Sequence, residues 1–388
     1  GPYYTSYPTH GEWSSELAHS DYVESIKDFF LKNGDAPIQI YLHIPFCAKL
    51  CYYCICNIIV SNNRERVQTF VDYLTREIDL LHKLFSGLSI KPNVKEIHLG
   101  GGTPSHLEND QLVRIIDKLG EIADLKNLDE FAMEIDPRTT TKDDLKFYSS
   151  LGINRISFGV QDFDPDVQRV INRVQPMEMV EALLPPEIRA GFDGLNFDLL
   201  YGLPLQTRKT FEKTIEQVKV LAPERITLLK YAHAPQIRKH MRMIDSKMLP
   251  PVDELPLMFY DAVQSLTADG YVWVGIDHFA KPSDDLAQAV AEKRAWRNFG
   301  GFTTGETHNL IGIGPTATCA IGNAYYQNAY AMKEYYKAID EGKFPIQQGY
   351  QMDSDEVLRR EVILKILCDS SLNYKQIESK FGISFPDY

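Results

Sequence analysis

The stretch YLHIPFCAKLCYYCICN, residues 41–57, places four cysteines within ten positions. The first three, Cys47, Cys51 and Cys54, have the spacing C-x3-C-x2-C. Three thiolates on one short loop can bind three irons of a 4Fe-4S cluster and leave the fourth iron open to another ligand. Zinc would need a fourth protein ligand, usually from a second Cys or His pair, and the sequence contains no such pair. The spacing therefore predicts an iron–sulfur cluster with one open coordination position.

The other cysteines are expected to have different roles. Cys56 follows Cys54 by two residues, and we expect its side chain to point away from the face that the first three thiols share. Cys319 and Cys368 stand alone and are expected to be ordinary buried thiols. Clustered cysteines in a chain without an export signal indicate metal ligands rather than disulfides.

Length and charge exclude several classes of protein. The chain has 388 residues, which suggests one large domain or two, and a formal net charge of -12 without a long basic run. This charge argues against nucleic-acid binding, because phosphate neutralisation needs clustered Lys and Arg. No apolar run approaches 18 residues and the first residues do not form a signal peptide, so we predict a cytoplasmic protein without a membrane span.

Short β-rich runs alternate with amphipathic helical patterns over the first two thirds of the chain. This alternation predicts a parallel sheet, closed or partly closed, with helices outside and chemistry at the carboxyl ends of the strands. The fold class is thus α/β, a partial TIM-like (β/α)6 barrel. Asn109, Thr141 and Thr207 occupy the expected helix caps. The expected strands are 38–44, 94–100, 130–136, 155–161, 195–203 and 225–231, and the expected helices are 64–85, 109–123, 141–152 and 207–221.

Beyond residue 235 the pattern is looser. We expect a helix at 253–269, one strand at 271–280, a helix near 284–293, strands and tight turns at 300–322, and two helices from about 353. The domain organisation predicted from these patterns is an N-terminal extension (1–37), the core (38–235), an α/β extension that completes the barrel (236–345) and the start of a mostly helical accessory domain (346–388).

Polar residues follow several of the expected strands. Singly, each is more often a cap or an ion-pair partner, but together they would form a ring at one mouth of the barrel, above the cysteines. LGGGTPS (99–105) adds a turn where the backbone can approach a ligand closely and present free N–H groups. His43, before the cysteines, is either a core histidine or a group near the cluster. The strand-end residues are Glu134, Gln161, Asp162, Asp198, Tyr231, Ala232 and His233, with Arg173 after the fourth strand.

These motifs resemble the radical S-adenosylmethionine enzymes and, more closely, the family of oxygen-independent coproporphyrinogen III oxidases. The resemblance runs from residue 1 to about 370. A cysteine two residues after the third ligand also separates this family from related haem chaperones. The matching motifs are YTSYPT, YLHIPFC-x3-CYYC-x-CN, GGGTPS, EIDPR, FGVQDF, INR, NFDLLYGLPLQT, YAHAP, IDHFAKPSDDLA, RNFGGFTT and LIGIGPTA.

The resemblance implies a mechanism and a set of cofactors. The cluster on Cys47, Cys51 and Cys54 would cleave S-adenosylmethionine to a 5′-deoxyadenosyl radical, which takes hydrogen from a porphyrinogen propionate. Carbon dioxide is then lost, a vinyl group remains, and two such events give protoporphyrinogen IX in haem biosynthesis. The cofactor supplies the hard chemical step. The resemblance also implies a tetrapyrrole substrate, an electron donor such as a flavodoxin or ferredoxin, and a monomeric enzyme.

The resemblance further implies two bound S-adenosylmethionine molecules. The residues expected at the first are Tyr41, Gly101, Glu134 and Thr318. Those expected at the second are Tyr53, Gly102, Thr103, Gln161, Arg173, Asp198 and Ala232. Cys56 matches a family cysteine that is not a cluster ligand.

One departure and two alternatives accompany this interpretation. Family members continue for several tens of residues past FPDY, so the C-terminal domain that covers the substrate is expected to be truncated here. A related radical enzyme could instead methylate a tetrapyrrole or open its ring during haem degradation. A haem chaperone is a weaker alternative, because it is expected to lack Cys56.

Overall fold

We describe a computed structural model of the chain for residues 7–305 and 309–388; the first half of the YTSYPT motif lies outside this range. All six expected strands form and lie side by side in chain order, each pair parallel, as predicted. Their parallel pairing requires a crossover between consecutive strands. The strands are β1 (Pro37–Ile44), β4 (Asn93–Gly101), β5 (Glu130–Ile135), β6 (Arg155–Gln161), β7 (Gly194–Tyr201) and β8 (Arg225–Lys230).

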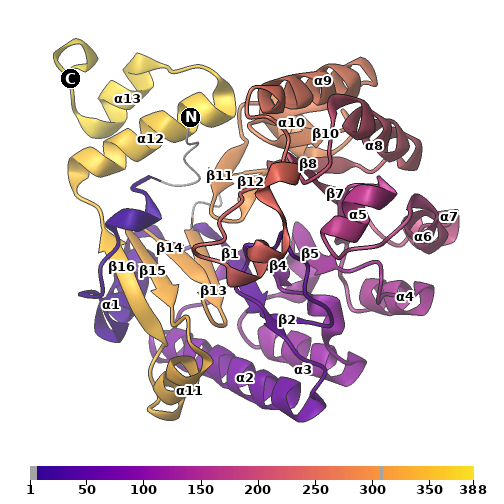
Figure 1. Cartoon of the computed structure of the whole chain (residues 1–388). Coiled ribbons are helices and arrows are strands. Elements are labelled where there is room, and N and C mark those ends of the chain that lie inside the picture. Colours follow the sequence, from indigo (N-terminus) through magenta and orange to yellow (C-terminus); the bar gives the residue numbers. More distant parts are fainter. Residues whose placement is uncertain (1–6, 306–308) are drawn as a thin grey trace.

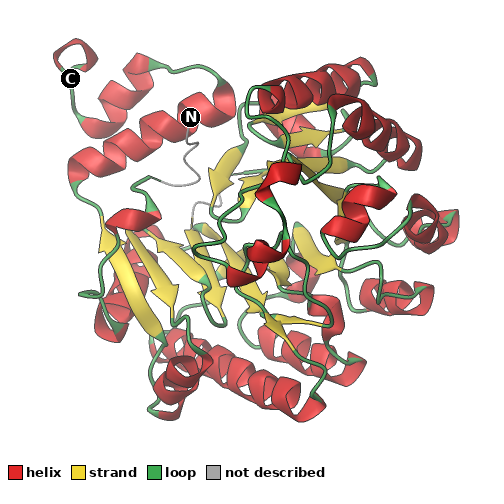
Figure 2. Cartoon of the chain, viewed as in Figure 1, coloured by secondary structure: helices red, strands yellow, loops and turns green. Residues whose placement is uncertain are grey.

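The crossovers are helices that cover the outside of the sheet (Figures 1 and 2). On α2 the apolar positions expected at helical spacing, among them Val67 and Leu74, are buried in the main core. Thr141 and Thr207 cap their helices as predicted. The prediction for Asn109 is wrong by one residue, because Glu108 occupies the cap and its N–H is bound by the Gln111 side chain. These helices are α2 (Arg64–Gly87), α3 (Asn109–Leu119), α4 (Lys142–Ser150), α5 (Pro165–Val170), α6 (Met177–Leu183), α7 (Pro186–Arg189) and α8 (Arg208–Leu221).

Further strands extend the sheet at both edges, to twelve among the described residues. Beside β1 lie β13 (Asn309–Ile313), which is parallel to it, and then three antiparallel strands, β14 (Thr318–Ile321), β15 (Ala324–Asn328) and β16 (Ile346–Gln351). Beside β8 lie β10 (His278–Ala280) and β9 (Val272–Gly275). The single strand expected at 271–280 is therefore wrong: Ile276, with φ +45°, turns the chain back between two strands. Within the described residues β9 and β16 do not pair, so the barrel stays open.

The remaining elements pack around this sheet. The helices expected after residue 235 form as α9 (Glu254–Ala268), α10 (Asp285–Ala291), α12 (Ser354–Asp369) and α13 (Tyr374–Phe381). α1 (His19–Asn33), α11 (Met332–Asp340) and the hairpin β11 (Trp296–Asn298) and β12 (Gly301–Thr303) complete the chain. Among the described helices none has the length and apolar character needed to cross a membrane.

A buried ion network lies at the amino ends of the strands, opposite the cysteines. Glu130 accepts hydrogen bonds from Arg155 (2.8 Å) and Arg225 (2.9 Å), and both guanidinium groups also pair with Asp284, at 3.2 and 2.8 Å. Burial alone would raise the pKa of Glu130, but Arg225 and Arg155 lower this pKa to about 2. The network ties β5, β6, β8 and the start of α10 together.

We predict that Glu130→Gln lowers the free energy of unfolding by about 3 kcal/mol in urea titrations, because two buried guanidinium groups lose one shared anion. The wild-type contribution is fully present above the unfolded pKa of 4.5 and is lost as pH falls toward 2, so the difference between the proteins should shrink over that window. Glu216→Gln, which removes an exposed pair with Lys219, should cost less than about 1 kcal/mol. Equal costs for the two variants would contradict this account.

Candidate functional site

The loop of residues 45–58, here called the cysteine loop, leaves β1 at the carboxyl edge of the sheet. Its two ends are joined by the short strands β2 (Phe46–Cys47) and β3 (Ile59–Val60), and the Ile59 N–H donates to the Pro45 carbonyl at 2.7 Å. Neighbouring elements bind the loop's backbone carbonyls: Asn172 bonds Leu50, His240 bonds Cys54, Arg238 bonds Ile55 and His43 bonds Asn57, over 2.7–3.0 Å. The loop is therefore held at both ends and along its length.

The three thiols of the C-x3-C-x2-C motif lie on the cysteine loop. Cys47 and Cys51 are buried and Cys54 is half-buried, and both Cys51 and Cys54 influence Cys47 electrostatically. Burial raises the pKa of Cys47 to about 12, although a hydrogen bond from the Thr103 hydroxyl (3.3 Å) opposes this shift. A bound metal would displace that proton, since metal ligands must be thiolates.

The chemistry of these thiols suits a cluster. Among the described residues no three His, Cys, Asp or Glu side chains converge on one point as ligands of a single ion would. A 4Fe-4S cluster binds each thiolate through a different iron, so its ligands need not converge. Thiolate ligands with hydrogen-bond donors around their sulfurs are the donor set that such clusters use.

The expectation that Cys56 points away from the other thiols is wrong. Cys54 and Cys56 are hydrogen-bonded through their side chains, and this bond lowers the pKa of Cys56. The chain bends at Cys56, so the alternation of side chains along an extended segment does not apply here. Cys56 therefore lies next to Cys54, although solvent still reaches it.

The glycine turn after β4 lies directly against the base of the cysteine loop. Gly101 has φ +110°, and a Cβ there would come within 2.7 Å of the His43 ring; a Cβ at Gly102 would lie 2.7 Å from the Pro45 carbonyl carbon. The close approach predicted for this turn is thus present. The N–H groups of Gly101 and Gly102, however, are not free as predicted. The Gly101 N–H donates to the Glu134 carboxylate (3.1 Å), and the Gly102 N–H donates to the Ile44 carbonyl (2.8 Å), because the two backbones are near enough to bond there.

The residues expected at the first S-adenosylmethionine lie on neighbouring strands. Glu134 on β5 accepts bonds from Gly101 and from His98 (3.2 Å), and burial would raise its pKa but the His98 bond lowers it. Tyr41 on β1 contacts the same turn, since a Cβ at Gly100 would lie 3.0 Å from its ring and 2.7 Å from Glu134. Tyr41 pairs with Gly312 on β13, and Gly312 in turn lies against the backbone of Thr318 on β14. The strand order therefore brings all four expected residues to one edge.

The residues expected at the second S-adenosylmethionine continue around the mouth. Arg173 donates to the Gly159 carbonyl (2.7 and 3.1 Å) and influences Tyr53 electrostatically. A β-bulge at Val160 shifts the register between β6 and β7, and Gln161, at the end of β6, has a φ of +67°. Asp198 lies opposite Gly159 on β7 and accepts bonds from Ser157 (2.9 Å) and Asn196 (2.8 Å).

The other expected residues at this mouth are Gly102 and Thr103 in the glycine turn and Ala232 after β8. The Thr103 side chain is buried, and its hydroxyl donates a hydrogen bond to the Cys47 sulfur.

Four further polar residues near the mouth are hydrogen-bonded to neighbouring protein groups. Asp162 is fully buried and bonds Gln206 and Thr214 behind the strands, where burial raises its pKa to about 6. Tyr231 and His233 bond each other at 2.8 Å. His43 bridges the Tyr41 hydroxyl (3.1 Å) and the Asn57 carbonyl, so it joins β1 to the end of the cysteine loop.

Two residues of the site escaped sequence reasoning, although both follow β5 directly. Arg138 donates to the Cys51 sulfur at 3.5 Å, the same distance at which Arg173 approaches it. Asp136 lies between the two guanidinium groups; burial would raise its pKa, but Arg173 and Arg138 lower it to about 2. Cys51 therefore faces a net positive charge. The strand-end position of EIDPR was the signal that could have identified them.

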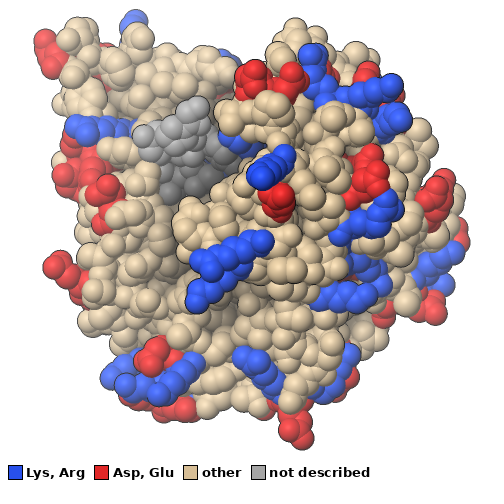
Figure 3. Space-filling view, in the orientation of Figure 1, with Lys and Arg blue, Asp and Glu red and all other residues tan. Residues whose placement is uncertain are grey.

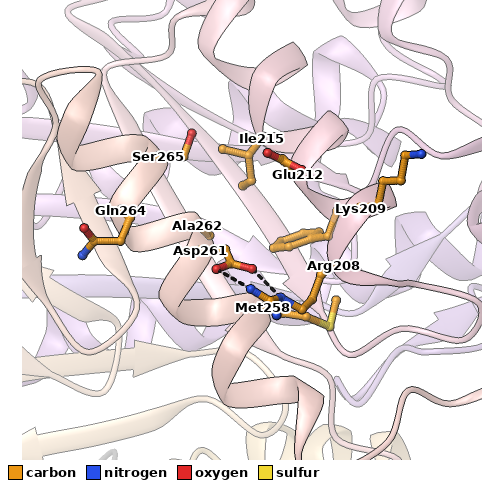
Figure 4. A pocket seen from close by; sticks show the side chains of 10 residues that line it. Arg208, Lys209, Glu212, Ile215, Met258, Asp261, Ala262, Gln264 and Ser265 are labelled. Atoms are coloured by element: carbon orange, nitrogen blue, oxygen red, sulfur yellow. Dashed lines mark hydrogen bonds and ion pairs between the residues drawn. The ribbon is translucent and has the colours of Figure 1, made fainter.

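Polar side chains at the mouth are reached by solvent. Glu134 is surrounded by protein, yet 37% of its side chain remains accessible to solvent. The side chain of His98 beside it is 28% accessible. A hollow lies outside the barrel between α8 and α9, where Arg208 pairs with Asp261 (Figure 4). None of the residues that line the outer hollow belongs to the cysteine loop or to the ring above it. The chemistry-bearing groups are concentrated at the mouth.

Comparison with known proteins agrees with this arrangement. Residues 41–218 match the family model described as "Radical SAM superfamily". Oxygen-independent coproporphyrinogen III oxidase of Escherichia coli (strain K12) is 38% identical over 388 residues, covering 100% of this chain and 83% of its own length. The enzyme of the same name from Helicobacter pylori (strain 26695) is 37% identical, covering 99% and 84%.

The fold agrees as well. The solved structure of coproporphyrinogen III oxidase from Escherichia coli, described as a radical SAM enzyme, superposes with a TM-score of 0.93 at 37% identity, covering 100% of this chain and 87% of that one. The chain belongs to the oxygen-independent coproporphyrinogen III oxidase family of the radical SAM superfamily.

Proposed function

We propose that this chain oxidatively decarboxylates two propionate side chains of coproporphyrinogen III to vinyl groups without oxygen, giving protoporphyrinogen IX. The observation that carries this proposal is the position of Cys47, Cys51 and Cys54 on one loop at the carboxyl edge of the sheet, beside strand-end polar groups such as Glu134 that solvent reaches. Membership of the family supports the substrate and the product.

The cofactors would be a 4Fe-4S cluster and two molecules of S-adenosylmethionine. When bound, they supply the radical that removes hydrogen from the propionate. Cys47, Cys51 and Cys54 would hold the cluster, with the Thr103 hydroxyl fixing the Cys47 sulfur. This hydroxyl replaces solvent at a buried sulfur and limits its movement.

The ring residues would orient the two S-adenosylmethionine molecules. The carboxylates of Glu134 and Asp198 suit ribose hydroxyls, because each oxygen retains lone pairs beyond the bond it already accepts. Arg173 suits a carboxylate by charge-assisted pairing. Tyr41 and Thr318 would bound the first molecule, and Tyr53, Gln161 and Ala232 the second. An electron donor such as a flavodoxin or ferredoxin completes the proposal.

The function can be tested by product analysis. Anaerobic incubation with coproporphyrinogen III, S-adenosylmethionine and dithionite should release carbon dioxide and form 5′-deoxyadenosine and protoporphyrinogen IX. Cys51→Ala should lose both iron and product, whereas Cys319→Ala, which removes a buried thiol distant from the loop in sequence, should keep iron and product. A methylated or ring-opened tetrapyrrole without carbon dioxide release would contradict the proposal.

A second prediction concerns Arg138. A cationic donor at a ligand sulfur favours the reduced, more negative form of a cluster. Arg138→Gln should therefore lower the midpoint potential in a titration monitored by electron paramagnetic resonance, by about 59 mV for a tenfold change in the one-electron equilibrium. Arg138→Lys should give a smaller shift, because it keeps the charge and loses the planar fork.

Arg76→Gln serves as the matched control for that titration, since Arg76 pairs with Asp340 on the outside of α2. Its potential should equal that of the wild type. An unchanged potential in Arg138→Gln with full iron content would show that the 3.5 Å contact with Cys51 has no electronic effect.

A further inference from the structure

The segment between β8 and α9 carries a local charge opposite to that of the chain. Residues 230–250 contain five Lys or Arg and a single Asp, whereas the whole chain has a formal net charge of -12. Lys239, Arg242 and Lys247 are exposed, and within the described residues their side chains form no ion pair. We call residues 234–249 the basic cap. Figure 3 shows Lys and Arg side chains standing on a mostly uncharged surface in this part of the face, where the cap runs in Figure 1.

The basic cap also exposes apolar side chains. Ile237 is 69% and Met243 is 63% accessible, and Ile55 of the cysteine loop is exposed beside them. The cap is nevertheless anchored, because Met241 and Ile244 are buried in a small core that includes Tyr53. Exposed apolar groups within a charged rim, on a segment held rigidly from below, are typical of a surface that contacts another protein.

The cap lies directly on the cysteine loop. His240 bonds the Cys54 carbonyl at 2.7 Å, and the Arg238 guanidinium bonds the Ile55 carbonyl at 2.8 Å. A molecule seated on the cap would therefore be separated from the Cys54 ligand by this one layer of residues. No thicker element intervenes between the cap and the loop.

We propose that the basic cap is the docking surface for a small acidic protein that carries one electron to the cluster. This inference rests on the proposed function, which requires an electron from outside the chain. One electron passes from the reduced carrier to the oxidised cluster, with no bond made or broken. Opposite charges steer the two proteins together despite the acidic character of this chain, and small interfaces are usual for transient redox complexes.

The tetrapyrrole, which also carries carboxylates, suits this surface less well. Small-molecule sites are concave and enclose most of their ligand. The cap residues Ile237, Lys239 and Met243 are exposed, whereas Glu134 and His98 at the mouth are only partly accessible, as groups that line an enclosed site would be. A carrier protein needs only to approach the loop from outside.

The test is the rate of cluster reduction by reduced flavodoxin in anaerobic stopped flow, followed by bleaching of the cluster absorbance. The triple variant Lys239→Glu, Arg242→Glu and Lys247→Glu should react roughly tenfold more slowly at low salt and lose most of the wild-type salt dependence. Ile237→Ser with Met243→Ser should raise the flavodoxin concentration needed for half-maximal rate and keep the salt dependence.

The control is the triple variant Lys83→Glu, Lys91→Glu and Lys126→Glu, which makes the same change in net charge with exposed residues at the opposite end of the barrel. Its rate of reduction by flavodoxin should stay within about twofold of the wild-type rate.

Dithionite should reduce all the proteins alike and support equal product formation. The cap is not the docking surface if the cap triple variant reacts at the wild-type rate, or if the cap and control triple variants slow equally. The same conclusion follows if the cap triple variant instead raises KM for the tetrapyrrole when dithionite is the reductant. Absence of product from wild type with dithionite would defeat the proposed function alone, since cluster reduction is measured without substrate.

Discussion

The close approach of two backbones, at the start of the cysteine loop and in the glycine turn after β4, is the constraint on which the site depends. The Gly102 N–H donates to the Ile44 carbonyl at 2.8 Å, and neither Gly101 nor Gly102 has room for a Cβ. This approach follows from the parallel register of β1 and β4, which pairs Ile44 with Gly101. It brings Thr103 to the Cys47 sulfur and lets Glu134 bind the turn from the next strand.

Charge is distributed unevenly about the three thiols. Arg138 and Arg173 approach Cys51 with only Asp136 between them, so this side of the site is positive. Glu134 and Asp198 place carboxylates on the strands beyond. In a partly buried site such charges interact strongly and hold their partners in fixed positions. The positive character continues outward through Arg238 to the basic cap, so the proposed ligand sites and the proposed docking surface lie on different sides of one loop.

The parallel core could be predicted from the sequence because each βα unit has a clear period and short turns; all six strands and the four main helices form where expected. The antiparallel edges could not, since they depend on pairing between distant segments, and positive φ angles at Gly275 and Ile276 split one apparent strand in two. The contacts between individual side chains could not be predicted from the sequence either. The spacing located the thiols, yet the Arg138 contact with Cys51 and the Cys54–Cys56 bond depend on local backbone geometry that spacing alone does not specify.

The central claim is that Cys47, Cys51 and Cys54 bind a cluster whose fourth iron has no protein ligand and accepts S-adenosylmethionine. Mössbauer spectroscopy of the enzyme reconstituted with 57Fe, with and without S-adenosylmethionine, tests this claim most directly. We expect one of the four irons to change its spectrum when S-adenosylmethionine is added, in the wild type and in Cys56→Ala alike. Four irons that do not respond, or a unique iron that appears only after Cys56 is removed, would make Cys56 the fourth ligand and contradict the account.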